Sequence, residues 1–197
     1  MQATQEGFEL VFEDTKSVNK LKIWKKDTDT GTISGHHVFI PDITKAMWEA
    51  AIPKMTAIVS KMAPKVLKME ELPDIDGCEA RHVTMNIPVP LVSNRQVFTI
   101  AWSEWISDDE FQSVSTSEGI DDVIEANKAK IGKDVLAHSF IEWTQIKFVT
   151  GGIQHVNIKH SNPGGKLPKT QPTSDLKKRK QEGLTKFFDI VKEEYAN

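Results

Sequence analysis

Two stretches of helical periodicity interrupt a chain whose other apolar segments alternate with polar residues. The first covers residues 43–62 and the second covers residues 170–195. Apolar side chains recur there every three or four positions, which places them on one face of a helix. The remaining segments alternate in part and are separated by turn residues, as expected of β-strands. The eight candidate strands are residues 8–14, 18–26, 32–40, 78–90, 95–105, 110–119, 135–149 and 152–161.

The order of these elements restricts the fold. Three strands precede the first helix, five strands separate it from the second, and Asp42 is placed to cap the first helix. Antiparallel strands joined by hairpins form a twisted sheet that curls, and such a sheet can hold a helix against its concave face. We therefore predict an α+β helix-grip fold, a curved antiparallel β-sheet wrapped around a long C-terminal helix. A chain of this length and composition is expected to form a single domain over residues 1–197.

Composition argues against several classes of protein. The formal net charge of -3 gives no basic surface for a nucleic-acid backbone, so no nucleic-acid partner is expected. The one cysteine, Cys78, cannot form an internal disulfide, and the histidines lack the spacing of a zinc site. No apolar run approaches the roughly 18 residues of a membrane-spanning helix. We expect a soluble, cytoplasmic monomer with no metal, no cofactor and no catalytic residues.

A corner built from proline and glycine joins the last strand to the C-terminal helix. It reads HSNPGGKLPK over residues 160–169, and its glycines supply backbone angles that other residues adopt only at a cost. This corner resembles the end of the START (steroidogenic acute regulatory protein-related) lipid-transfer domains, in which Asp or Asn precedes Pro-Gly-Gly and another proline follows. The matching residues are Asn162, Pro163, Gly164, Gly165 and Pro168.

A second segment, PVPLVSNRQVF, is similar to another START motif. Pro88, Pro90, Ser93, Arg95, Val97 and Phe98 carry this match. The chain has Gln96 where the family usually has Asp. The family's tunnel arginine would fall at Ala101 and its acidic partner near His82, so that ion pair is not reproduced. The resemblance implies a lipid ligand and a transient membrane contact, with a phospholipid or fatty acyl chain favoured over a sterol.

The strand at residues 95–105 has one face of small side chains, which would leave space if they faced the helix. The apolar stripe of the C-terminal helix would close that space as a lid. Because such a stripe commonly completes a solid core, a filled interior is the alternative. The residues expected to line the lipid cavity are His82, Thr84, Val97, Thr99, Ala101, Ser103, Phe140, Glu142, Thr144, Leu184, Phe187, Phe188 and Val191.

The connection at residues 119–134 is long for a compact domain, and we expect a short helical or irregular flap at the mouth of the cavity. Its apolar residues would touch a membrane when the lid opens. The basic run KKRK at residues 177–180 is either a solvated helix face or a contact with anionic lipid headgroups. The residues expected to form the lid and gate are Ile120, Val123, Ile124, Pro163, Gly164 and Gly165.

Glu142 shares a strand face with apolar residues, where a carboxylate is unfavourable unless it is paired. Arg81 or His82 is the expected partner, and the pair would anchor a headgroup or act as acid and base; a solvated Glu142 is the alternative. Three functions remain open: a lipid carrier, a cyclase-type or hydrolase-type enzyme using Glu142 with His82 or His138, and a cochaperone-like protein-binding module with a filled core.

Overall fold

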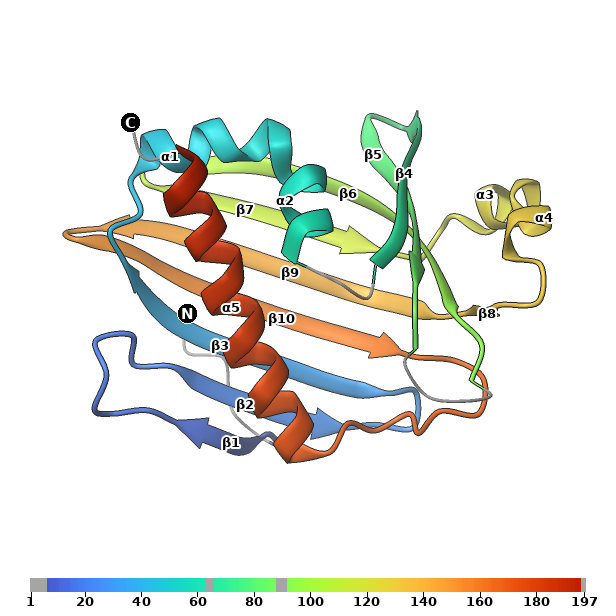
Figure 1. The fold of residues 1–197 in the computed structure, drawn as a ribbon, viewed down its shortest axis with the longest axis horizontal. Coiled ribbons are helices and arrows are strands. Elements are labelled where there is room, and N and C mark those ends of the chain that lie inside the picture. The colour runs from blue at the N-terminus through green and yellow to red at the C-terminus, as the bar shows by residue number, and fades with distance from the viewer. Residues whose placement is uncertain (1–6, 63–65, 88–91, 196–197) are drawn as a thin grey trace.

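The computed structural model describes residues 7–62, 66–87 and 92–195. Ten strands of these residues form one sheet in the order β1-β2-β3-β10-β9-β7-β6-β5-β4, with β8 pairing parallel to β6 (Figure 1). Every other pairing is antiparallel. The strands are β1 (Glu9–Glu13), β2 (Lys22–Asp27), β3 (Thr32–Pro41), β4 (Val66–Ile75), β5 (Cys78–Met85), β6 (Arg95–Ser107), β7 (Glu110–Thr116), β8 (Val135–Leu136), β9 (His138–Val149) and β10 (Gly152–Asn162).

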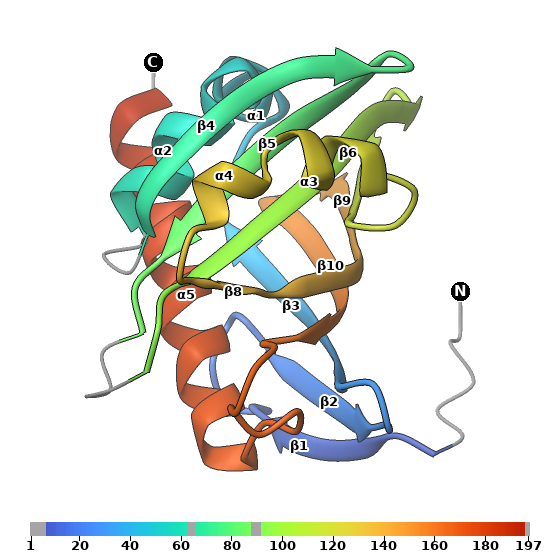
Figure 2. The ribbon, with the colours of Figure 1, turned by 90° about the vertical axis from the view of Figure 1, so that its right-hand side faces the viewer.

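The C-terminal helix α5 (Thr173–Tyr195) crosses one face of this sheet (Figure 1). The short helices α3 (Asp121–Ala126) and α4 (Lys128–Ile131) lie beside the β5 and β6 end of the sheet (Figure 2). The α+β helix-grip fold predicted from the sequence is confirmed. None of the helices in the described residues is long and apolar enough to cross a membrane.

The first predicted helix is divided into α1 (Lys45–Ala51), a 3₁₀ turn η1 (Ile52–Lys54) and α2 (Met55–Met62). Pro53 lies in the 3₁₀ turn, where its missing amide hydrogen is tolerated. Thr44, not Asp42, caps α1, because the Thr44 side chain accepts a hydrogen bond from the Met47 amide at 3.2 Å. The prediction that Asp42 is the cap was wrong: its φ is 61° and its amide donates to the Gly151 carbonyl.

Strand β4 has no counterpart in the sequence prediction. It lies at the sheet edge, pairs with β5 alone, and its register shifts between Val66 and Lys68 and between Leu72 and Ile75. An edge strand of this kind is partly exposed on both faces, so it lacks a clean alternation of polar and apolar residues. The predicted strand 135–149 is interrupted at Ala137, and β5 ends at Met85, while residues 88–90 lie outside the described part of the chain.

The packed core lies between α5, the α1–α2 segment and the sheet. Trp48 is 3% exposed and contacts the rings of Phe111 and Phe187 at centroid distances of 5.8 and 6.1 Å. Ile146 and Val191 are completely buried in the same cluster. This cluster therefore fixes the helices to the sheet, and the cavity described next opens beside it.

Candidate functional site

A cavity of about 530 Å³ lies between the sheet and the helices that cross it. Its walls come from β3, β5, β6, β7, β9 and β10 on one side and from the α1–α2 segment and α5 on the other. Pockets that bind small ligands commonly have volumes in this range. The interior of the grip is therefore partly hollow.

Short side chains on β6 and β7 account for much of this space. Ala101 lies opposite Ser115, and Ser103 lies opposite Ser113, in the antiparallel ladder. All four line the cavity. Val97 and Thr99, predicted to continue this wall, do not line it, because they lie toward the Arg95 end of β6, where the strand meets the Pro-Gly-Gly corner.

The apolar stripe of α5 contributes Leu184, Phe187 and Phe188 to the cavity wall. Phe188 is 2% exposed and its ring packs edge-on against His155. Val191, predicted with them, is fully buried in the packed core and does not line the cavity. The stripe thus combines the two arrangements considered from the sequence: it lines a hollow at Phe187 and belongs to a solid core one turn later, at Val191.

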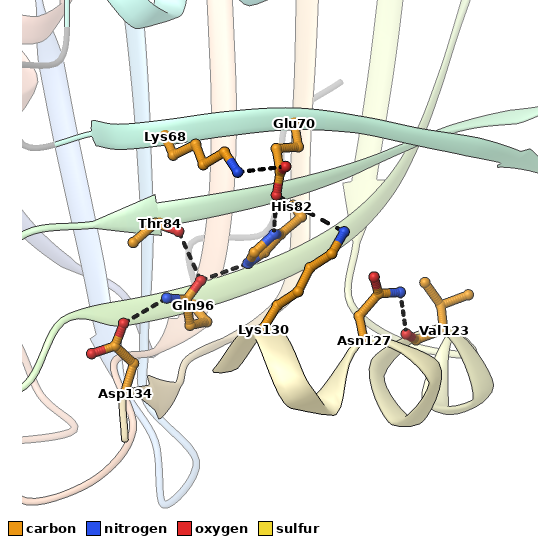
Figure 3. Close-up of polar contacts among 9 residues, drawn as sticks. All are labelled: Lys68, Glu70, His82, Thr84, Gln96, Val123, Asn127, Lys130 and Asp134. Carbon is orange, nitrogen blue, oxygen red and sulfur yellow. Dashed lines mark hydrogen bonds and ion pairs between the residues drawn. The ribbon is translucent and has the colours of Figure 1, made fainter. Parts of the chain in front are cut away.

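His82 and Thr84 lie away from the cavity, so their predicted place in its lining is wrong. The ladder sets His82 opposite Phe98, and the two rings stack at 4.3 Å. Both ring nitrogens of His82 lie close to oxygen atoms (Figure 3). Nδ1 lies 3.1 Å from a carboxylate oxygen of Glu70, and Nε2 lies 2.5 Å from the side-chain oxygen of Gln96. A hydrogen bond from Lys68 and one with His82 lower the pKa of Glu70 to about 2.

Gln96 joins this network to the flap. Its Oε1 also accepts from the Thr84 hydroxyl at 2.8 Å, and its Nε2 donates to Asp134 at 2.6 Å, just after α4 (Figure 3). Lys130 of α4 approaches Glu70 at 4.0 Å. Gln96 is 3% exposed, so this amide has a buried polar role at the position where the START motif usually has Asp.

The flap does form two short helices, but Ile120 is only 2% exposed and lies in the interior. Its carbonyl accepts hydrogen bonds from the amides of Val123 and Ile124 and starts α3. The prediction that Ile120 presents an apolar surface to a membrane is therefore wrong for this conformation. Val123 and Ile124 are half-buried.

Phe140 was also expected in the cavity, and it lies elsewhere. The register between β9 and β10 shifts so that His160 pairs with Ile141 while Ser161 pairs with Ser139. This bulge leaves Phe140 unpaired, and its ring packs against His138 and His160 at 4.6 and 4.4 Å. A strict alternation along the strand therefore fails at this position.

Glu142 and Thr144 line the cavity as predicted from their strand face. The partner of Glu142 is Lys159, directly opposite on β10, whose Nζ lies 2.7 Å from the carboxylate. The expected partners were wrong, because Arg81 pairs with Glu79 and His82 lies away from the cavity. Burial favours a raised pKa for Glu142, but Lys159 and Lys180 outweigh it and hold the pKa below its ordinary value.

Further polar groups surround this ion pair. Lys180 of α5 donates to the Asn157 side chain at 2.8 Å, and burial lowers the pKa of Lys180 to about 8. His36 Nε2 and His155 Nδ1 lie 2.9 Å apart. Burial, with the nearby Lys180 charge, lowers the pKa of His155 to about 3 and that of His36 well below its ordinary value. Both imidazoles are thus neutral at pH 7, which leaves Lys159 and Lys180 as the cations of this group.

The structure does not bring together the residue pairs of the enzyme hypothesis. His82 contacts Glu70, and His138 Nε2 lies 2.8 Å from Glu118 near the surface. Glu142 contacts Lys159 and Asn157 instead. An acid and base pair made of Glu142 with either histidine therefore has no support in this geometry.

The two segments that resemble START motifs meet in space. Arg95 is 2% exposed and donates through Nε to the Pro163 carbonyl at 2.6 Å and through Nη2 to the Gly164 carbonyl at 3.3 Å. Gly164 and Gly165 have φ of 69° and 61°, and a Cβ on Gly164 would lie 2.4 Å from the Leu136 carbonyl oxygen. The corner is thus held by a buried arginine and requires glycine at residue 164.

By sequence, the chain matches no family model and no curated protein. By structure, it is similar to human STARD10, with a TM-score of 0.70 and 16% identity over 96% of this chain and 74% of that one. It is also similar to human StAR-related lipid transfer protein 5, with a TM-score of 0.67 and 11% identity over 99% and 89% of the two chains. A third similar structure is a STAR-related lipid transfer protein from Xanthomonas axonopodis. Its TM-score is 0.63, and the identity is 15% over 97% of this chain and 99% of that one. The chain therefore has the helix-grip fold of the START domains.

Proposed function

We propose that this chain binds one lipid in the cavity beneath α5 and carries it between membranes without covalent chemistry. The observation that carries the proposal is the hollow of about 530 Å³ where a solid core was the alternative. A cochaperone-like module with a filled interior fits this hollow less well. Two of the similar structures, human StAR-related lipid transfer protein 5 and the Xanthomonas protein, are named as lipid transfer proteins. These names support a lipid as the ligand class.

Burial of the acyl chain supplies the affinity. Each methylene moved from water into an apolar wall contributes about 0.8 kcal/mol, so a long chain binds strongly once α5 is in place. Leu184, Phe187 and Phe188 of α5 cover the hollow from the helix side. Release then requires α5 to move away from the sheet, and contact with a membrane surface is the step that we propose triggers it.

Phe187→Asp tests whether α5 retains the ligand. The new carboxylate would face the acyl chain, and burying it there is unfavourable, so we expect the bound lipid to fall by about tenfold or more. Thr185→Asp is the matched control, because it adds the same group to an exposed position of the same helix. The measurement is organic extraction of each purified protein followed by mass spectrometry, with circular dichroism to confirm that the sheet is folded. Equal lipid content in both folded variants would contradict the role of α5 as a lid.

A further inference from the structure

One end of the cavity carries more positive than negative charge. Four basic and two acidic side chains line the cavity: Arg81, Lys159, Arg179, Lys180, Glu79 and Glu142. Each acid is already paired, Glu79 with Arg81 and Glu142 with Lys159. Arg179 is exposed to solvent, whereas Lys180 is half-buried. The excess charge within the cavity is therefore that of Lys180.

Lys180 has a neutral partner and no acidic one. Its ammonium group donates to the Asn157 side chain, and among the described residues no carboxylate comes within ion-pair distance of it. Burial lowers the pKa of Lys180 to about 8, while the negative charge of Glu142 opposes this shift. The group is thus still largely protonated at pH 7. A half-buried cation without a contacting anion is less favourable than a solvated or paired one, and an anion entering the cavity would relieve that cost.

A second buried polar group stands beside it. His36 lies directly opposite Asn157 in the ladder of β3 and β10, is 4% exposed, and lines the cavity. Its Nδ1 has no hydrogen-bond partner among the residues that the structure describes. Buried polar nitrogens are nearly always paired, so the polar groups around Lys180 and Asn157 are incompletely satisfied.

The size of the cavity indicates how large the part of the ligand within it is. At roughly 30 Å³ for each heavy atom, the share of one water in the liquid, 530 Å³ accommodates about 18 heavy atoms. A long-chain fatty acid has a similar number, whereas a phospholipid with two long chains has more than twice as many. This volume therefore favours one acyl chain, and of the two ligand classes expected from the sequence it favours the fatty acyl compound.

We propose that the ligand is a single-chain amphiphile with an anionic head, a carboxylate or a phosphate monoester, whose head binds Lys180 beside His36 and Asn157. Its chain lies between the Ala101 and Ser113 wall and α5. The Glu142–Lys159 pair remains intact, so Lys159 keeps its own carboxylate. This inference rests on the proposed function, because it names the ligand class of the same cavity.

Fluorescence titration with cis-parinaric acid and its methyl ester tests the charge of the head. The two probes share one chain, so they differ only in the anionic group. We expect the acid to bind at least about tenfold more tightly than the ester, because hydrogen bonds to charged groups contribute more than neutral ones. Competition by lysophosphatidic acid, compared with competition by a fatty acid of the same chain length, then distinguishes a phosphate head from a carboxylate head.

Lys180→Gln should lower the affinity for the acid to about that for the ester, which removes the preference for the acid. Lys178→Gln is the matched control, since Lys178 lies on the same helix, is exposed, and does not line the cavity. A pH series on the wild-type protein tests the same contact without a substitution. Affinity for the acid should fall as pH rises above about 8, where the Lys180 ammonium loses its proton, while affinity for the ester stays constant.

Equal binding of acid and ester, unchanged in Lys180→Gln, would overturn this inference and leave the lipid-binding function standing. Organic extraction of a neutral or two-chain lipid from a protein that binds neither probe would also overturn this inference and leave the lipid-binding function standing. If neither probe binds and extraction yields no lipid at all, the proposed function itself fails. The three results are therefore distinguishable.

Discussion

Glu142 and Lys159 form the one directly opposed ion pair in the cavity lining of β9 and β10. Their side chains keep 35% and 40% of their surface accessible, because they face the hollow and not packed atoms. The sequence indicated that Glu142 lies on an interior face but could not identify its partner. That partner is set by the β9–β10 register, which a single strand does not specify. The alternation of His155, Asn157 and Lys159 on β10 was the available signal for a polar wall.

Glu142→Gln should lower the free energy of unfolding at pH 7 by about 1–3 kcal/mol, because it leaves the Lys159 charge without its carboxylate and removes the nearby negative charge that favours protonated Lys180. The folded-state pKa of Glu142 is lowered, so its contribution is full above the ordinary value of 4.5 and is lost as pH falls through the folded-state value. The difference between wild type and variant, measured by urea unfolding, should therefore shrink in acid. Glu118→Gln at an exposed site is the control, and a difference independent of pH would contradict this account.

At the scale of elements, most strands and the C-terminal helix could be predicted from hydrophobic spacing. The failures have local causes. Strand β4 is an edge strand with irregular register, and Pro53 turns the first helix into two. The bulge at Phe140 moves a side chain away from the face that alternation predicts. The polar network of Gln96 and Asp134 was missed because its members come from β4, β5, β6 and the flap, which only the folded sheet brings together.

The corner between β10 and α5 gives a prediction with a built-in control. Gly164→Ala forces a side chain into a backbone with φ of 69° and against the Leu136 carbonyl, so it should lower the free energy of unfolding by about 1–3 kcal/mol. Gly183→Ala, inside α5, meets nothing within 4 Å and should raise it by about 0.5–1 kcal/mol. Thermal unfolding of both variants measures the direction of each change in stability. Destabilisation of both variants by the same amount would refute the special role of the corner.

At the scale of the whole molecule, two sequence motifs nearly seventy residues apart meet when Arg95 donates to Pro163 and Gly164. Their contact orients α5 across the sheet, and the small residues of β6 and β7 keep the space below it open. The resemblance predicted this architecture. The cationic end was not predicted, because Lys180 lines the cavity from a basic run for which a solvated helix face is the favoured interpretation from the sequence.

Native mass spectrometry of the purified protein tests the central claim, that the grip encloses a hollow occupied by one lipid. We predict a complex heavier than the 22.2 kDa chain by the mass of one single-chain amphiphile, which disappears after organic extraction and returns when palmitic acid is added. A spectrum that contains the bare chain alone, both as purified and after incubation with excess palmitic acid, would contradict the claim.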